Sequence, residues 1–296
     1  MSDQTKALFA YLAVCLFWGS TYLAIRIGVE DFPPSLFASF RFLIAGSILF
    51  IFVKIKKFKL PSKKKMIRQQ AIIGLLMLLG GTGLVCHAEK TLHSSIASLI
   101  VSTVPLFIAL FEIVILRKKR MSKFGVLGLF AGFGGVAYLA LFDSGDITFD
   151  MTGMLLVLFA SLFWSIGSIY SKSAESDGHI FSNISIQMLS GGLGLFILGS
   201  LTGELSKVHP TTSSLLSLAY LIVFGSLVAY SCYIYALSKW PASRVGTYAY
   251  VNPIVALILG VLILSEPVSP KILVSMFVIL SGVILVQKSK IDDVVK

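Results

Sequence analysis

The chain has 296 residues, of which 56% are hydrophobic and only 13% are charged. Soluble domains carry about 25% charged residues, so this composition excludes a soluble fold. The net charge of +11 would suit nucleic-acid binding, but its confinement to short loops argues against that role.

Apolar blocks of about 20 residues follow one another along the chain, and each is long enough to cross a bilayer as an α-helix. Because lipid offers the backbone no hydrogen-bond partners, each block is predicted to be helical. The first block is too long for the apolar core of a signal peptide, so we expect it to be retained. The ten predicted spans are 7–29, 35–54, 69–89, 94–116, 124–142, 151–171, 180–202, 214–237, 243–265 and 271–288.

Basic residues concentrate in alternate loops. Eight lysines and arginines lie between residues 54 and 68, and five lie between residues 117 and 123. Acidic residues dominate the loops between them, at Glu30 and Asp31 and again from Asp143 to Asp150. Since basic loops stay in the cytoplasm, we expect a multi-pass protein with both termini cytoplasmic.

The second half of the chain repeats the first. An offset of about 147 residues aligns Trp18 with Trp164, Ala88 with Ala236, Pro105 with Pro253 and Gly135 with Gly282. The pattern predicts two homologous five-helix units, 1–142 and 148–290. Because five is odd, the second unit enters the membrane from the opposite face. Such inverted repeats are typical of carriers that work by alternating access.

The segment "FWGSTYLAIRIGVEDFPPSLFASFRFLIAGSILF" (17–50) closely resembles the opening of EamA-type transporters of the drug/metabolite transporter superfamily. The mid-span prolines, the "SEP" at 265–267 and the ten-span double repeat strengthen that resemblance. It implies a bacterial inner-membrane carrier, usually an exporter of amino acids or other small metabolites. It also implies a cavity lined mainly by the first, third, fourth, sixth, eighth and ninth spans. The first repeat departs from the family with "LRKKRMS" (116–122), which weakens any role for an acidic residue there.

Two aromatic-led helix faces are candidates for the cavity wall. Trp18 and Tyr22 share a face with Arg26, at i, i+4 and i+8, and Trp164 shares one with Ser168 and Lys172. The tryptophans either contact substrate or pack the core. The two cations lie near span ends, where snorkelling to the interface is the favoured interpretation.

Matched prolines, Pro105 and Pro253, interrupt the fourth and ninth spans, and each removes a helical hydrogen bond. Broken helices at matched places in two repeats point to a substrate site, although a packing kink is the alternative. We therefore predict a site near these breaks that also takes polar and aromatic residues of the fourth, eighth and ninth spans: Ser102, Tyr230, Tyr250 and Asn252.

Three titratable residues lie inside or near predicted spans. Glu112 is a candidate for proton coupling, with pairing to the basic loop beyond it as the favoured alternative. Arg41 is expected to form a structural ion pair with Glu30 or Asp31 rather than to bind a substrate carboxylate. His87 has Glu89 nearby, but its position at a helix exit favours an ordinary polar role over a relay.

The leading function is a secondary-active exporter of amino acids, other small metabolites or drugs. A channel and an uptake carrier are the alternatives. An intramembrane enzyme is remote, because the sequence has neither HExxH nor GxSxG and no pair of aspartates within spans. The cysteines lie in spans without a CxxC pair, so we expect no metal site and no cofactor. The expected partners are a small-molecule substrate and the lipid bilayer, and the chain is expected to act as a monomer or a homodimer.

Overall fold

The fold is a bundle of membrane-spanning helices. The computed structural model describes residues 2–114, 122–141 and 150–292. Within them, ten helical spans are long and apolar enough to cross a membrane, and no strand occurs. The prediction of an all-α membrane fold with ten spans is confirmed.

The helices follow in an order that shows where spans are continuous and where they are broken. The first repeat contains α1 (Asp3–Asp31), α2 (Pro34–Ile55), α3 (Lys64–Gly74), η1 (Leu75–Gly83), α4 (Leu84–Ala88), α5 (Ser94–Val101), α6 (Val104–Val114) and α7 (Lys123–Leu141). The second contains α8 (Met151–Ser173), α9 (Ile180–Leu201), η2 (Glu204–Lys207), α10 (Thr212–Tyr220), η3 (Leu221–Tyr230), α11 (Ser231–Lys239), α12 (Ala242–Val245), η4 (Gly246–Tyr250), α13 (Asn252–Leu264) and α14 (Pro270–Asp292).

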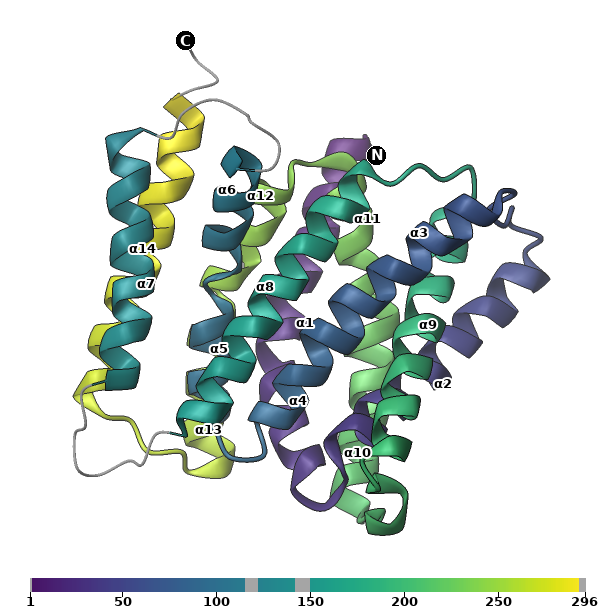
Figure 1. Ribbon diagram of the computed structural model, residues 1–296, viewed down its shortest axis with the longest axis horizontal. Helices are drawn as coiled ribbons and strands as arrows, with labels where there is room; N and C mark the ends of the chain where they lie inside the picture. The colour runs from purple at the N-terminus through teal and green to yellow at the C-terminus, as the bar shows by residue number, and fades with distance from the viewer. Residues whose placement is uncertain (1, 115–121, 142–149, 293–296) are drawn as a thin grey trace.

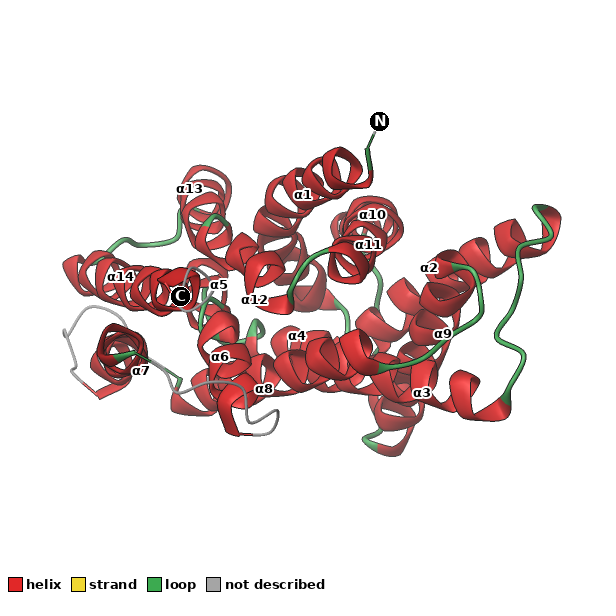
Figure 2. Cartoon of the chain, turned by 90° about the horizontal axis from the view of Figure 1, so that it is seen from above, coloured by secondary structure: helices red, strands yellow, loops and turns green. Residues whose placement is uncertain are grey.

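The two halves repeat each other in irregular features as well as in length. The third and eighth spans both widen into a π-helix at matching positions, η1 and η3. The fourth and ninth spans are both interrupted just before their prolines, at Ser102–Thr103 and through the 3₁₀ turn η4. Equivalent helices pack against each other, α2 on α9 and α7 on α14. Figure 2 shows these two pairs at opposite ends of the molecule, with the remaining helices between them.

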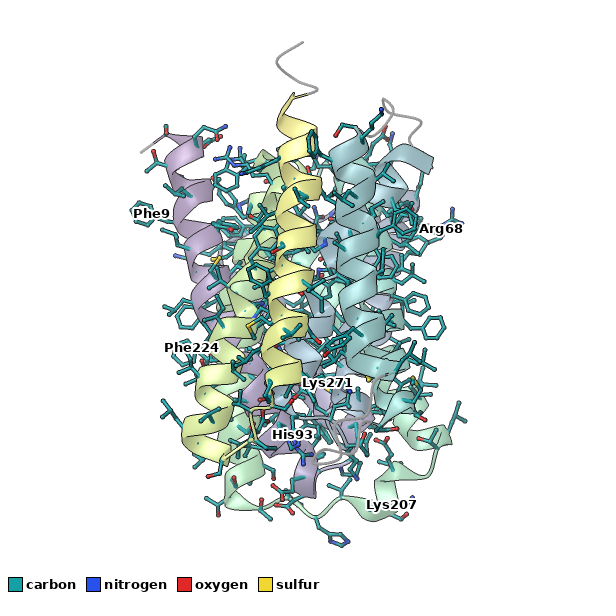
Figure 3. The ribbon with its side chains drawn as sticks, turned by 90° about the vertical axis from the view of Figure 1, so that its left-hand side faces the viewer. Phe9, Arg68, His93, Lys207, Phe224 and Lys271 are labelled. Atoms are coloured by element: carbon teal, nitrogen blue, oxygen red, sulfur yellow. The ribbon has the colours of Figure 1, made fainter. Side chains whose placement is uncertain are left out.

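The helix directions fit the inverted arrangement. In Figure 1, α1 begins and α14 finishes at the same end of the bundle. We call this the terminal end, and the opposite end, where α4 finishes and α5 begins, the far end. Side chains such as Phe9 and Phe224 point outward from the flanks, while His93, Lys207 and Lys271 lie toward the far end (Figure 3). So many exposed large apolar side chains belong in lipid rather than in water.

Glycines bring α7 and α14 into backbone contact. A Cβ on Gly282 would lie 2.6 Å from the carbonyl oxygen of Gly128 and would also collide with the backbone nitrogen of Gly132. Gly128 and Gly132 lie four residues apart on α7 and form a pair of small residues. The structure assigns it to packing within the chain, as small-residue motifs allow in membranes.

Gly282→Ala is therefore expected to force α7 and α14 apart and to destabilise the fold by about 1–3 kcal/mol, as overpacking does. The matched control is Gly134→Ala on α7, because an added Cβ there meets no atom of the described residues within 4 Å. Thermal unfolding of the purified protein in detergent measures both variants. Equal midpoints for the two would contradict this packing.

Candidate functional site

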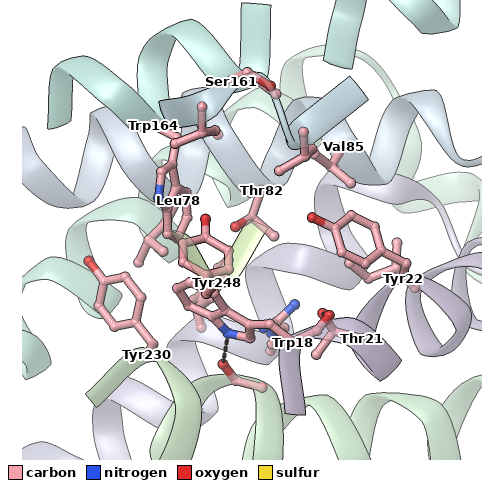
Figure 4. Close-up of a pocket in the computed structure, with 18 residues that line it drawn as sticks. Trp18, Thr21, Tyr22, Leu78, Thr82, Val85, Ser161, Trp164, Tyr230 and Tyr248 are labelled. Atoms are coloured by element: carbon pink, nitrogen blue, oxygen red, sulfur yellow. Dashed lines mark hydrogen bonds between the residues drawn. The ribbon is translucent and has the colours of Figure 1, made fainter. Parts of the chain in front are cut away.

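A cavity of about 60 Å³ lies between the two repeats, near the middle of the spans. Seven of the ten spans contribute to its wall, including the six that the family resemblance implied and also the second. The lining residues on which the site depends are Trp18, Tyr22, Arg41, Thr82, Trp164, Tyr230 and Tyr248. Figure 4 shows Thr82 between the rings of Trp164 and Tyr248 on one side and Tyr22 and Val85 on the other.

Aromatic rings from both repeats pack together at this cavity. The ring of Trp18 meets that of its repeat mate Trp164 edge to face, with 5.2 Å between centroids. Trp18 also lies 4.9 Å from the rings of Tyr233 and Tyr248, and Tyr230 lies 6.3 Å from Trp164. These separations are within the favourable range for aromatic pairs, so the rings form one connected wall.

Hydrogen bonds hold both indoles in place. Trp18 Nε1 donates to the carbonyl oxygen of Gly225 at 3.1 Å, a bond visible in Figure 4. Trp164 Nε1 donates to the hydroxyl of Tyr233 at 3.2 Å, and that hydroxyl also lies 2.8 Å from Ser168 Oγ. Each indole that lines the cavity is therefore fixed in orientation by a hydrogen bond as well as by its ring contacts.

Arg41 brings a positive charge into this aromatic wall. The side chain is only 4% exposed, and its Nε donates to Ser226 Oγ at 2.8 Å. Its Nη1 has no hydrogen-bond partner among the described residues. The expected ion pair with Glu30 or Asp31 is wrong, because both acids are exposed and neither is bonded to Arg41. The Asp31 carboxylate instead accepts a hydrogen bond from Thr211.

Four of the predicted site residues, Trp18, Tyr22, Trp164 and Tyr230, do line the cavity. Ser102 lies outside its wall, buried and bonded to the carbonyl of Leu99 within its own helix. Tyr250 points toward α14 and donates to the carbonyl of Val283 at 3.3 Å.

The other predicted site residues also lie outside the wall. Asn252 is buried, and its amide has no hydrogen-bond partner in the described part of the chain. Pro105 and Pro253 follow the breaks in their spans but do not contact the cavity. His87 lies at the far end, with Nε2 2.8 Å from Ser35 Oγ and 3.9 Å from the Glu204 carboxylate. Glu112 belongs to α6, but its side chain lies outside the described residues.

Arg26 and Lys172 take equivalent positions at opposite ends of the bundle. Arg26 donates to the carbonyls of Glu89 and Lys90, at 2.7 and 2.9 Å. Lys172 donates to the carbonyl of Leu237 at 2.8 Å. Leu237 follows Glu89 by 148 residues, so the two contacts are repeat mates. Both cations bind helix C-terminal carbonyls, where a positive charge is favourable.

A second pocket, of about 250 Å³, opens toward the terminal end and is lined by polar residues that include Gln70, Lys172 and Gln187. A short hydrogen-bond chain separates it from the central cavity. Tyr230 donates to Gln187 Oε1 at 2.7 Å, and Gln187 Nε2 donates to Gln70 Oε1 at 2.6 Å. Three side chains therefore form the partition between the two spaces, which we call the Tyr230 partition.

Sequence reasoning missed part of this site. Thr82 and Ser161 line the cavity, and Gln70 and Gln187 close one end of it. The signal that remained unused was the presence of polar side chains well inside spans, since such residues rarely face lipid. Among the described residues, no group of three or more potential metal ligands occurs.

Comparison with known proteins agrees with this architecture. The chain matches the EamA-like transporter family twice, over residues 5–141 and 151–287. The "Uncharacterized inner membrane transporter YedA" of Escherichia coli K12 is 36% identical over 97% of this chain and 92% of its own length. The "Uncharacterized transporter YoaV" of Bacillus subtilis is 25% identical over 95% of this chain and 97% of its own.

The fold also occurs among solved structures. The crystal structure of another protein has a TM-score of 0.67 and 20% sequence identity to this chain. The similarity covers 95% of this chain and 96% of the other. At this level of identity the two proteins share a fold.

Proposed function

Because this chain belongs to the EamA-like transporter family, we propose that it is a secondary-active carrier in the cell membrane that exports small carboxylate-bearing metabolites, amino acids among them. The binding site is the central cavity, and the two inverted repeats, 1–142 and 148–290, alternate its access between the two sides of the membrane.

The observation that carries this proposal is the unpartnered Nη1 of Arg41 at the cavity wall. A buried guanidinium nitrogen without an acceptor is unfavourable, and a carboxylate is the acceptor that fits the planar guanidinium best. Within the described residues no carboxylate of the chain forms an ion pair with Arg41. A substrate carboxylate would supply the missing acceptor.

The aromatic wall favours a substrate that is compact and amphipathic. Trp18, Trp164 and Tyr248 present ring faces and edges to the cavity, which suit either an apolar side chain or an ammonium group through a cation–π interaction. A zwitterionic amino acid combines a carboxylate for Arg41 with an ammonium group and, in many cases, an apolar side chain for the rings. This chemistry makes amino acids the first class to test.

The small volume of the cavity supports a binding site that changes shape during transport. About 60 Å³ holds only a few water molecules, and ligand pockets in proteins span about 300–1,000 Å³. The cavity must therefore widen to admit a metabolite. Opening the Tyr230 partition would join it to the 250 Å³ pocket at the terminal end. That end carries the basic loop between α2 and α3, which supports a cytoplasmic location for both termini and for this opening.

Counterflow tests the proposal. Liposomes containing the purified chain are preloaded with unlabelled amino acids and challenged with single labelled solutes, each amino acid being paired with its decarboxylated amine. We expect transient accumulation of at least one labelled amino acid and none of its amine. Equilibration without accumulation would indicate a channel. No flux of any carboxylate solute through folded protein would reject a carrier of this class.

A further inference from the structure

Glu89 at the far end is a buried acid that the proposed transport site does not use. It directly follows Ala88, the last residue of the third span, and its side chain is fully buried. Neither carboxyl oxygen has a hydrogen-bond partner among the described residues. Burying an ionised carboxylate without donors is strongly unfavourable, so this environment selects the neutral acid.

Two other acids at the far end differ from Glu89, because their carboxylates accept hydrogen bonds from the chain. Glu266 receives hydrogen bonds from the backbone nitrogens of Ser94 and Ser95, at 2.7 and 3.2 Å, and from Ser95 Oγ at 2.9 Å. Glu204 receives one from the backbone nitrogen of Leu36 at 3.0 Å. Both carboxylates lie at helix N-termini, where the helix dipole favours a negative charge.

Glu89 lies instead at the C-terminal cap of α4, where the helix dipole opposes a negative charge. Of the three acids, it alone is placed so that both the dipole and the missing donors favour protonation.

The charged and titratable groups around Glu89 come from four elements. They are Tyr22 and Arg26 of α1, Arg41 of α2, Cys86 of α4 and Glu266 after α13. The guanidinium of Arg26 binds backbone carbonyls, and that of Arg41 binds Ser226. Burial and the carboxylate of Glu266 together raise the pKa of Glu89 well above its ordinary value, against the opposing effect of Arg26 and Arg41.

The repeat gives an internal comparison for this position. The mate of Glu89 is Leu237, and the mate of Arg26 is Lys172. Each cation binds the carbonyl of its partner residue, so the backbone arrangement is the same at both ends. The terminal end opens into a polar pocket beside Leu237, whereas the far end encloses Glu89. The acid is therefore not needed for the shared helix packing.

We propose that Glu89 is a proton-binding site, and that the far end of the carrier closes only when this carboxylate has taken up a proton. On closing, a proton from water adds to one carboxylate oxygen and forms the O–H bond of a neutral acid. On opening, water hydrates the carboxyl group and the proton can leave. This inference rests on the proposed carrier function, because each transport cycle must close the far end once.

The test compares wild-type chain with Glu89→Gln, which imitates the protonated acid, and with Glu89→Leu, which copies the residue in the second repeat. Counterflow is measured in liposomes with equal pH on both sides, from about pH 5 to about pH 9. We expect wild-type counterflow to fall by up to tenfold per pH unit above the pKa of Glu89, because the closed state requires the proton. Both variants should keep a constant rate.

Thermal unfolding in detergent over the same pH range gives a second readout that needs no substrate. Because folding raises the pKa of Glu89, its contribution to stability is largest at low pH and is lost as pH rises toward the folded-state pKa. The wild-type midpoint should therefore fall with pH relative to both variants. Glu175→Gln, which changes an exposed acid, should follow the wild type.

The outcomes separate the two proposals. If the wild type and the Glu89 variants give parallel pH profiles in either measurement, the proton site is rejected. If Glu89→Gln does not fold, Glu89→Leu decides on the same criterion. If no protein shows counterflow at any pH, the carrier function is rejected, and the unfolding profiles still decide whether Glu89 binds a proton.

Discussion

In counterflow, the Arg41→Gln variant is expected to have an apparent affinity for a carboxylate substrate about 30- to 700-fold weaker than that of the wild type. Removing one partner of a buried, charge-assisted contact costs about 2–4 kcal/mol, and each 1.4 kcal/mol corresponds to a factor of ten. Arg41→Lys should also be impaired, because a single ammonium group cannot both bind Ser226 and present a second nitrogen to the cavity.

Two controls distinguish binding from folding in this experiment. Arg68→Gln removes an arginine that is exposed at the surface and should leave affinity unchanged. Glutamine is neutral and leaves no buried charge at position 41, so thermal unfolding of Arg41→Gln should remain close to that of the wild type. Wild-type affinity in folded Arg41→Gln would mean that the substrate carboxylate, if there is one, binds elsewhere.

The largest loss of stability is expected from Glu266→Ala. The Glu266 side chain crosses from the second repeat to the first and accepts three hydrogen bonds at the start of α5. It is only 6% exposed, so water cannot replace those bonds. Leaving two backbone N–H groups and one hydroxyl without an acceptor should destabilise the fold by about 3–5 kcal/mol.

Denaturant or thermal unfolding in detergent measures this loss. Glu266→Gln retains one acceptor oxygen and should lose less than half as much stability as Glu266→Ala. Glu175→Ala changes an exposed loop acid and should have little effect. A Glu266→Ala protein as stable as Glu175→Ala would show that the link between the repeats contributes nothing measurable.

Glu266 also illustrates that a sequence motif does not by itself reveal which contacts its residues make. "SEP" was recognisable as a family feature, but its function could not be read from the letters. In the structure, Ser265 takes a left-handed conformation with φ 52°, and the chain turns back so that Glu266 reaches α5. The bond depends on the placement of a helix some 170 residues earlier in the chain, which local pattern does not encode.

In the candidate site, too, some residues could be predicted from the sequence and others could not. Trp18, Tyr22, Trp164 and Tyr230 could be predicted because each lies deep in a span, and the tryptophans share repeat positions. Ser102 and Tyr250 were wrongly predicted to face the cavity, because the span breaks near them turn the helix and change which face points inward. Arg41 was assigned to a nearby acid because sequence distance is a poor guide to which helices meet.

The sequence by itself determined that this protein lies in a membrane, crosses it ten times and consists of two inverted repeats. Hydrophobic length and repeated residues are properties of each segment, and lipid leaves a segment of that length only the helical form. The tertiary structure alone decided that, among the described residues, nothing bonds one nitrogen of Arg41 at the cavity or the buried carboxyl group of Glu89, while Glu266 accepts three hydrogen bonds. These differences arise because the cost of a buried polar group depends on which partners the packed helices bring to it.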